Sequence, residues 1–247
     1  MIKKITIYIL AGLVFMLPLI VTASEIPAHE IVYEEKEEGT DVYTVKYTVS
    51  DKLIRIDDSE ESDEDQNGFI IFDLKKETIY SISHFDKTIL IIPKYSYTKK
   101  EKTEEAKIKP IITYKKLDDA PTITGKVVFN YKSMVATDAG MEVCMDIQLA
   151  ENLLPSVIAK LKQYQTVVSS QQVKTINMTP EEYRTPCYLL DQVYNRGDYY
   201  DKGLPLHEWH SNNRVRILKS FDGVSVNKDI FLLPMHYKRF TLDELYQ

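Results

Sequence analysis

The sequence predicts an α+β fold, in which an antiparallel sheet carries helices on one of its faces. Short segments with strand character follow one another from residue 42 to residue 93, joined by short polar connections, whereas parallel strands would need long crossovers. A helical pattern follows at 155–168, and strand patterns return after residue 203. Strands, then a helix, then strands, without strict alternation, are typical of α+β domains.

The first strands show period-two alternation of apolar and polar residues. Within 42–49, Tyr43, Val45 and Tyr47 share one face of the strand, and polar side chains occupy the other. Segment 69–74 is apolar on both faces, so we expect it to be central or covered by a helix. The other strands of this group are predicted at 53–57, 78–84 and 88–93.

The stretch from 95 to 125 interrupts this pattern. Its charge-rich part, 99–109, mixes signs without helical or strand periodicity, so we predict an irregular excursion here. Strand patterns resume at 126–131 and 141–147, and no internal repeat is found. Residues 24–247 are therefore predicted to form a single domain.

Helical spacing is clearest where Val157, Leu161, Tyr164 and Val168 recur at intervals of four and three residues. Pro155 lies in the first turn, where its missing N–H costs little. This segment is predicted to pack one apolar face on the sheet.

A second, shorter helix is predicted at 186–194, with Thr185 as its N-cap and Pro186 as its first residue. The last strands are predicted at 204–209, 215–221 and 229–233.

The first 23 residues have the pattern of a secretory signal peptide. Lys3 and Lys4 precede the apolar run 5–21, and Ala23 offers a small residue at the cleavage position. A retained membrane anchor is the alternative, but the run is shorter than the ~20 residues of a spanning helix. We expect cleavage after Ala23 and a periplasmic or secreted product. No cysteine lies near the cut, so no lipid anchor is expected.

Cys144 and Cys187 are the only cysteines. An oxidising compartment favours a disulfide between them. Two buried free thiols or a redox pair are the alternatives, but no Cys-x-x-Cys pattern is present. We predict a structural bridge.

Charge makes some partners improbable. Acidic residues outnumber basic ones 37 to 31, whereas proteins that bind nucleic acid or anionic membranes carry an excess of Lys and Arg. We expect no nucleic-acid partner, and no transmembrane segment once the signal peptide is removed.

Asp63, Asp65 and Asn67, followed by Gly68, match the first half of a calcium-binding loop. The ligand expected at the end of such a loop is a glutamate, yet that position is Leu74. A solvated acidic hairpin loop over 57–68 is the favoured interpretation, and no cofactor is predicted.

His207 and His210 form a His-x-x-His pattern. On the predicted strand they point to opposite faces and cannot share one metal ion. We expect both to be partly exposed strand residues.

Tyrosine is abundant, at 17 of 247 residues, and several tyrosines fall on predicted strands. Aromatic side chains on the inner face of a sheet can line an apolar or sugar-binding pocket, although core packing is the favoured explanation. The candidate ligand-binding residues are Tyr43, Val45, Tyr47 and Ile82. No catalytic residue is predicted, because the sequence contains no nucleophile motif.

Several segments together resemble exported bacterial proteins of unknown function and the periplasmic lipoprotein-carrier (LolA-like) superfamily. The segments are 43–47, 53–57, 68–73, 186–187, 203–206 and 231–234. The resemblance implies a strongly curved antiparallel sheet, an incomplete barrel, with helices packed on its concave face. It also implies an acyl chain as ligand; no functional residue is transferred.

Three functions follow as hypotheses. The first is a soluble periplasmic, non-catalytic binding or carrier-like protein for an acyl chain or a lipoprotein. The second is an envelope protein-protein interaction module whose interior is filled by its own helix. The third is a hydrolase whose residues meet only in the folded state. An internal pocket favours the first, and an exposed apolar patch over a filled interior favours the second.

Overall fold

The computed structural model describes residues 24–59 and 68–245, so the expected signal peptide lies outside the described residues. One twelve-stranded sheet dominates the fold, in the order β12-β6-β5-β4-β3-β2-β1-β11-β10-β9-β8-β7. All pairs of neighbouring strands are antiparallel except β12 and β6. The sheet is not closed, because β12 and β7 lie at its two ends. The predicted α+β class is confirmed.

The strands are β1 (Glu25–Lys36), β2 (Tyr43–Val49), β3 (Leu53–Ser59), β4 (Phe69–Asp73), β5 (Thr78–Ser83), β6 (Thr88–Pro93), β7 (Ile111–Lys116), β8 (Val128–Thr137), β9 (Gly140–Ala150), β10 (Leu204–His210), β11 (Val215–Asn227) and β12 (Lys238–Thr241). The helices are α1 (Lys99–Glu105), α2 (Pro155–Thr175), α3 (Pro186–Tyr188) and α4 (Leu242–Leu245). Short turns of helix are η1 (Ile176–Met178), η2 (Glu181–Tyr183), η3 (Leu189–Val193), η4 (Asp198–Asp201) and η5 (Lys228–Phe231).

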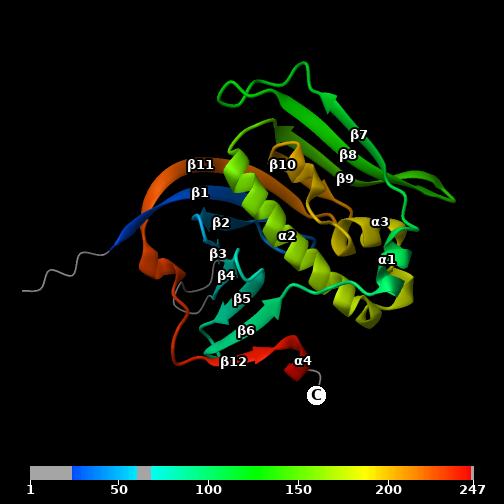
Figure 1. Cartoon of the computed structure of the whole chain (residues 1–247). Coiled ribbons are helices and arrows are strands. Elements are labelled where there is room, and N and C mark those ends of the chain that lie inside the picture. Colours follow the sequence, from blue (N-terminus) through cyan, green and yellow to red (C-terminus); the bar gives the residue numbers. More distant parts are fainter. Residues whose placement is uncertain (1–23, 60–67, 246–247) are drawn as a thin grey trace, which may run out of the picture.

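Strand β1 lies at the centre of the sheet, between β2 and β11, and the sequence pattern does not reveal it. Ile31 and Tyr33 are buried at alternate positions, but the charged run 34–36 obscures the alternation. Figure 1 shows β1 and β11 as two long neighbouring strands that arch together over α2. The strand that comes first in the sequence, β1, is therefore paired with β11, the last long strand of the chain.

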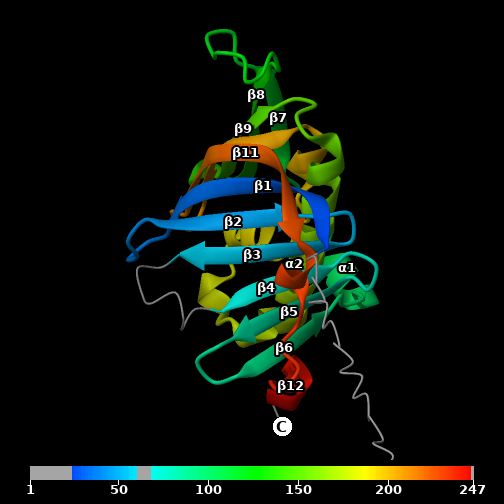
Figure 2. The same cartoon turned by 90° about the vertical axis from the view of Figure 1, so that its left-hand side faces the viewer.

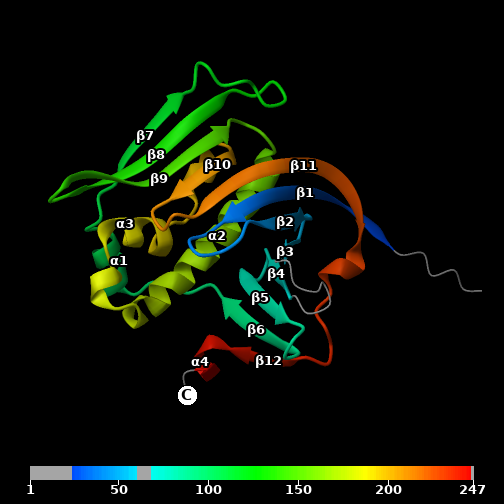
Figure 3. The same cartoon turned by 180° about the vertical axis from the view of Figure 1, so that it is seen from behind.

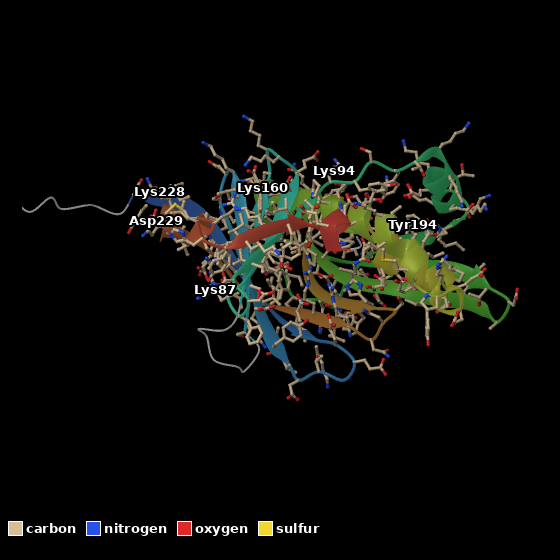
Figure 4. All side chains as sticks on the ribbon, turned by 90° about the horizontal axis from the view of Figure 1, so that it is seen from below. Lys87, Lys94, Lys160, Tyr194, Lys228 and Asp229 are labelled. Atoms are coloured by element: carbon tan, nitrogen blue, oxygen red, sulfur yellow. A yellow bond between two sulfur atoms is a disulfide. The ribbon has the colours of Figure 1, made fainter. Side chains whose placement is uncertain are left out.

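The helix predicted around Val157 and Leu161 is confirmed as α2. Both side chains are buried in the main core with sheet residues such as Ile31 and Ile147. Figure 2 shows the strands from β11 down to β12 facing the viewer, with α2 behind them. The ammonium of Lys160, labelled in Figure 4, donates to the carbonyl oxygen of Ser50 at 2.9 Å and ties the helix to the β2–β3 turn.

None of the helices in the described ranges has both the length and the apolar character needed to cross a membrane.

The prediction of an irregular stretch over 95–125 is wrong, because the stretch contains α1 and β7. Thr98 and Glu101 form a capping box, in which each side chain accepts a hydrogen bond from the other residue's backbone N–H. Glu105, at the end of α1, pairs with Arg196 at 2.6 Å. Caps and ion pairs stabilise this helix without an apolar face, so hydrophobic periodicity cannot detect it.

A strand at 229–233 is also not observed. The side chain of Asn227 accepts a hydrogen bond from the Asp229 N–H at 2.9 Å and starts the helical turn η5. Phe231 then packs in a second core cluster with Phe69 and Ile82. Figure 3 shows the chain running on from η5 to β12, which lies beside β6.

The predicted disulfide is confirmed, with the Cα atoms of Cys144 and Cys187 4.9 Å apart. Cys144 belongs to β9 and Cys187 to α3, and both pack with Val135 in a small buried cluster. Thr185 caps the short helix through the N–H of Tyr188, as predicted. The bridge therefore attaches the helical segment 186–193 to the sheet.

Replacing both cysteines by alanine is expected to lower the free energy of unfolding by about 4 kcal/mol, because the bridge closes a loop of 43 residues. Urea unfolding of the oxidised protein and of the double variant measures the difference. Val143→Ala, at the exposed neighbouring position, is the matched control. An unchanged midpoint in the double variant would show that the bridge contributes nothing.

Candidate functional site

A pocket of about 530 Å³ lies between strands β2–β5, helix α2 and the start of β11. Figures 1 and 3 show α2 passing beside these strands. The apolar lining residues are Val45, Ile56, Phe69, Ile70, Ile82 and Val168, and three tyrosines, Tyr43, Tyr47 and Tyr164, join them. The polar lining residues are Glu35, Glu37, Asp58, Ser81, Gln165, Arg214 and Arg216.

The four candidate ligand-binding residues all border this pocket. Tyr43, Val45 and Tyr47 alternate along β2 and belong to the main core cluster or pack against it. Ile82 differs, because its side chain packs in the second cluster with Phe69, while its neighbour along β5, Ser81, faces the pocket side. The candidate calcium ligands Asp63, Asp65 and Asn67 lie outside the described residues.

Gly68 is at the pocket margin, where β4 begins. A Cβ atom on this residue would lie 1.8 Å from the carbonyl oxygen of Ile82. Only glycine allows this close approach of the two chain segments. The narrow spacing between the start of β4 and the end of β5 thus depends on the residue type at 68.

Two arginines form the polar end of the pocket. Arg216 belongs to β11, and Arg214 lies two residues earlier, in the turn directly before this strand. The carboxylate of the buried Glu35 on β1 lies 3.8 Å from Arg214 Nε and 3.7 Å from Arg216 Nη1. Both distances exceed a hydrogen bond, so Glu35 balances the charges without satisfying the donors.

Arg216 is fully engaged by the protein. Its guanidinium donates to the buried carboxylate of Glu208 through Nε, at 2.8 Å, and through Nη2. It also donates to the hydroxyls of Tyr47 at 3.3 Å and Tyr200 at 3.2 Å. The ring of Tyr33 lies 4.3 Å from its central carbon. This is a structural arginine that joins four elements of the core.

His210 continues the network away from the pocket. Its Nδ1 lies 2.7 Å from a carboxylate oxygen of Asp191 and its Nε2 lies 3.1 Å from one of Glu208, and the protonated ring can donate to both. The prediction of a partly exposed His210 is wrong, since its side chain is only 4% exposed. Asp191 also accepts from the N–H and the hydroxyl of Ser211, both at 2.9 Å. The segment attached by the disulfide thus supplies a carboxylate to the buried network.

Burial and these neighbours shift several pKa values. Burial opposes ionisation of Glu208, but Arg216 and His210 outweigh it and lower the pKa of the carboxyl to about 2. Burial also opposes the charged form of His210, yet hydrogen bonds to Asp191 and Glu208 raise its pKa. Burial raises the pKa of the Tyr164 hydroxyl to about 12. The pocket tyrosine therefore remains a neutral hydrogen-bonding group.

In the part of the chain that the structure describes, no group of three or more histidine, cysteine, aspartate or glutamate side chains is arranged to hold a metal ion. His207 and His210 do not converge: the ring of His207 packs against that of Trp209, with centroids 4.1 Å apart and the planes tilted by 35°. Burial lowers the pKa of His207.

No family model and no curated protein matches the chain. Two solved structures of PNGF-II, in space groups C2 and P21, are similar over 89% of this chain, with 13% and 12% identity and TM-scores of 0.40 and 0.39. The chain spans 32% of the length of these proteins.

Sequence reasoning does not find the polar end of the pocket. Glu35, Glu208 and Arg216 are ordinary charged residues on strands, where a solvated face is the usual explanation, and Arg214 directly precedes a strand. The one available signal in the sequence is the recurrence of arginine at alternate positions, 214 and 216.

Replacing His210 by glutamine is expected to destabilise the protein more at about pH 6 than at about pH 9. A folded-state pKa above the unfolded value of ~6.5 stabilises the fold below that value and loses this effect as the pH rises. Urea unfolding at both pH values measures the two differences.

His207→Gln is the matched control, with the opposite sign expected. The folded-state pKa of His207 is lowered, so its contribution is lost as the pH falls. A destabilisation by His210→Gln that is equal at both pH values would contradict the raised pKa.

Proposed function

We propose that the protein is a non-catalytic binding or carrier-like protein that holds an acyl chain, or the acyl part of a lipoprotein, in the pocket beside α2. The observation that carries this proposal is the pocket itself. Its volume of about 530 Å³ falls in the range of ~300–1,000 Å³ typical of small-molecule sites. Apolar side chains on β2, β3, β4 and α2 can contact a chain-like group, and the polar end can orient it.

The proposal includes the finer architecture that the LolA-like resemblance implies, an incomplete barrel with helices on its concave face. The unclosed sheet and the arch of β1 and β11 over α2 support this proposal (Figure 1). Buried residues of α2 share one cluster with residues of β1, β2 and β9. In this arrangement Tyr164 and Val168 would form the helical wall of a ligand cavity.

We also propose that the protein acts outside the cytosol, after cleavage at Ala23. The disulfide supports this location, because disulfides persist in oxidising compartments.

The two alternative functions predict other features. A self-filled interaction module would leave no pocket at this position, so the pocket favours the binding function. A hydrolase would place groups with shifted pKa values inside the cleft. Glu208 and His210 have such shifts, but neither lines the pocket. The lining groups with shifted pKa values are tyrosines and arginines, whose pKa values are raised further above neutral, so none of these is suited to proton transfer near pH 7.

Native mass spectrometry of the protein, purified from the cells that make it, tests the proposal. We expect an added mass in the lipid range that disappears after organic extraction. A bare polypeptide that also fails to bind an added acyl ligand would overturn the proposal.

Filling the pocket is expected to abolish binding. Val168→Trp places a large ring on the α2 wall and should weaken the affinity for a fluorescent acyl probe by at least about tenfold, because overpacking excludes the ligand. Fluorescence titration measures the affinity. Gln172→Trp, at an exposed position of the same helix, is the control and should bind as the parent does.

A further inference from the structure

Arg214 differs from its neighbour Arg216 in having one buried donor atom without a hydrogen-bond partner in the described part of the chain. Its Nε atom is buried and has no hydrogen-bond partner among the described residues. The Glu35 carboxylate oxygen Oε2 lies 3.8 Å from it, beyond hydrogen-bond distance. A buried donor without a partner costs about 1–3 kcal/mol, so the site is built for an acceptor that the folded chain does not supply.

The backbone holds Arg214 in this position. The Arg214 N–H donates to the side chain of Asn212 at 3.2 Å, and the Arg214 carbonyl accepts from the His210 N–H at 3.0 Å. Both bonds belong to the tight turn between β10 and β11. The guanidinium is therefore presented to the pocket by a fixed strand end.

The positive charge of the two arginines is already balanced. Arg214 and Arg216 face the carboxylates of Glu35 and Glu208 within 4 Å, which leaves no net charge. Glu37 and Asp58 also line the pocket and add negative charge. An anionic ligand group would find no unpaired positive charge here, and a cationic one would be repelled by Arg214. A neutral acceptor satisfies the donors without adding charge.

Apolar side chains continue from this end of the pocket. Val45, Ile70 and Val168 line it together with Arg214. A ligand that contacts both parts has an apolar chain attached to a hydrogen-bond acceptor.

Resting on the proposed binding function, we propose that Arg214 donates hydrogen bonds to an uncharged carbonyl oxygen of the ligand, so that the pocket selects acyl esters or amides over free fatty acids. The ester or amide carbonyl occupies the polar end, and its acyl chain lies along the apolar wall. Arg216 remains a structural residue in this arrangement.

Four ligands that share one chain length test this selection by competition with a fluorescent acyl probe at about pH 8, where laurate is ionised. They are glycerol monolaurate, an ester; lauroyl ethanolamide, an amide; 1-O-dodecylglycerol, an ether that lacks the carbonyl; and laurate, an anion. We expect the parent protein to bind the ester or the amide about tenfold more tightly than the ether and than laurate. Whichever of the ester and the amide binds more tightly shows which type of carbonyl group the pocket prefers.

Arg214→Met keeps much of the side-chain volume and removes the donors. It should bind the ether as the parent does and lose the preference for the carbonyl ligands. Lys219→Met removes the same charge from an exposed position of β11 and should keep the preference. Thermal unfolding verifies that both variants are folded, and the ligand series on the parent protein is decisive without them.

Laurate as the tightest ligand of the parent, or equal binding of ester, amide and ether, would overturn this inference while leaving the binding function intact. Unchanged carbonyl preference in folded Arg214→Met would also overturn it. If the parent bound neither the probe nor any of the four ligands, the proposed function itself would fail.

Discussion

The buried pairing of Arg216 with Glu208 is the interaction on which the rest of the structure depends. It joins β11 to β10 directly, reaches β2 through Tyr47 and η4 through Tyr200, and places Tyr33 of β1 against the guanidinium. Removing one partner of such a pair leaves an uncompensated charge in the core, which costs far more than the pair contributes. The geometry of the centre of the sheet is thus fixed by a polar contact as well as by apolar packing.

This network also explains why charged groups at the polar end of the pocket do not leave unpaired charges in the core. Arg216 lines the cavity and binds Glu208, which in turn binds His210, so these internal charges are paired within the protein before any ligand arrives. Arg214 lies at the edge of this network of paired charges. Its donors face the cavity, and its charge is balanced by Glu35 at a distance too long for a hydrogen bond.

Much of the fold can be predicted from the sequence where the hydrophobic period is regular. The alternation in β2 and the helical spacing in α2 identify both elements, and they place Tyr43 and Tyr47 beside the pocket. The pattern fails where polar interactions determine the structure. The helix α1 is stabilised by a capping box, and a side-chain cap at Asn227 starts a helical turn in place of the expected strand.

The polar end of the site is hidden for a related reason. A charged residue on a strand is interpreted as solvent-exposed unless its partner is known. Glu208 contacts Arg216 only because β10 pairs with β11 in the folded sheet. Glu35 meets them across the strand pair β1–β11, whose members lie far apart in the sequence. Such contacts depend on topology and leave no local signature.

The pairing of β1 with β11 has a consequence for the order of assembly. The central strand β1 has β11, near the other end of the chain, as one of its two neighbours. The backbone groups on that edge of β1 can therefore pair only after β11 has been synthesised. Contacts of such long sequence separation slow folding. Until β11 pairs with it, the edge of β1 that faces β11 leaves its backbone hydrogen-bonding groups open, and open strand edges favour aggregation.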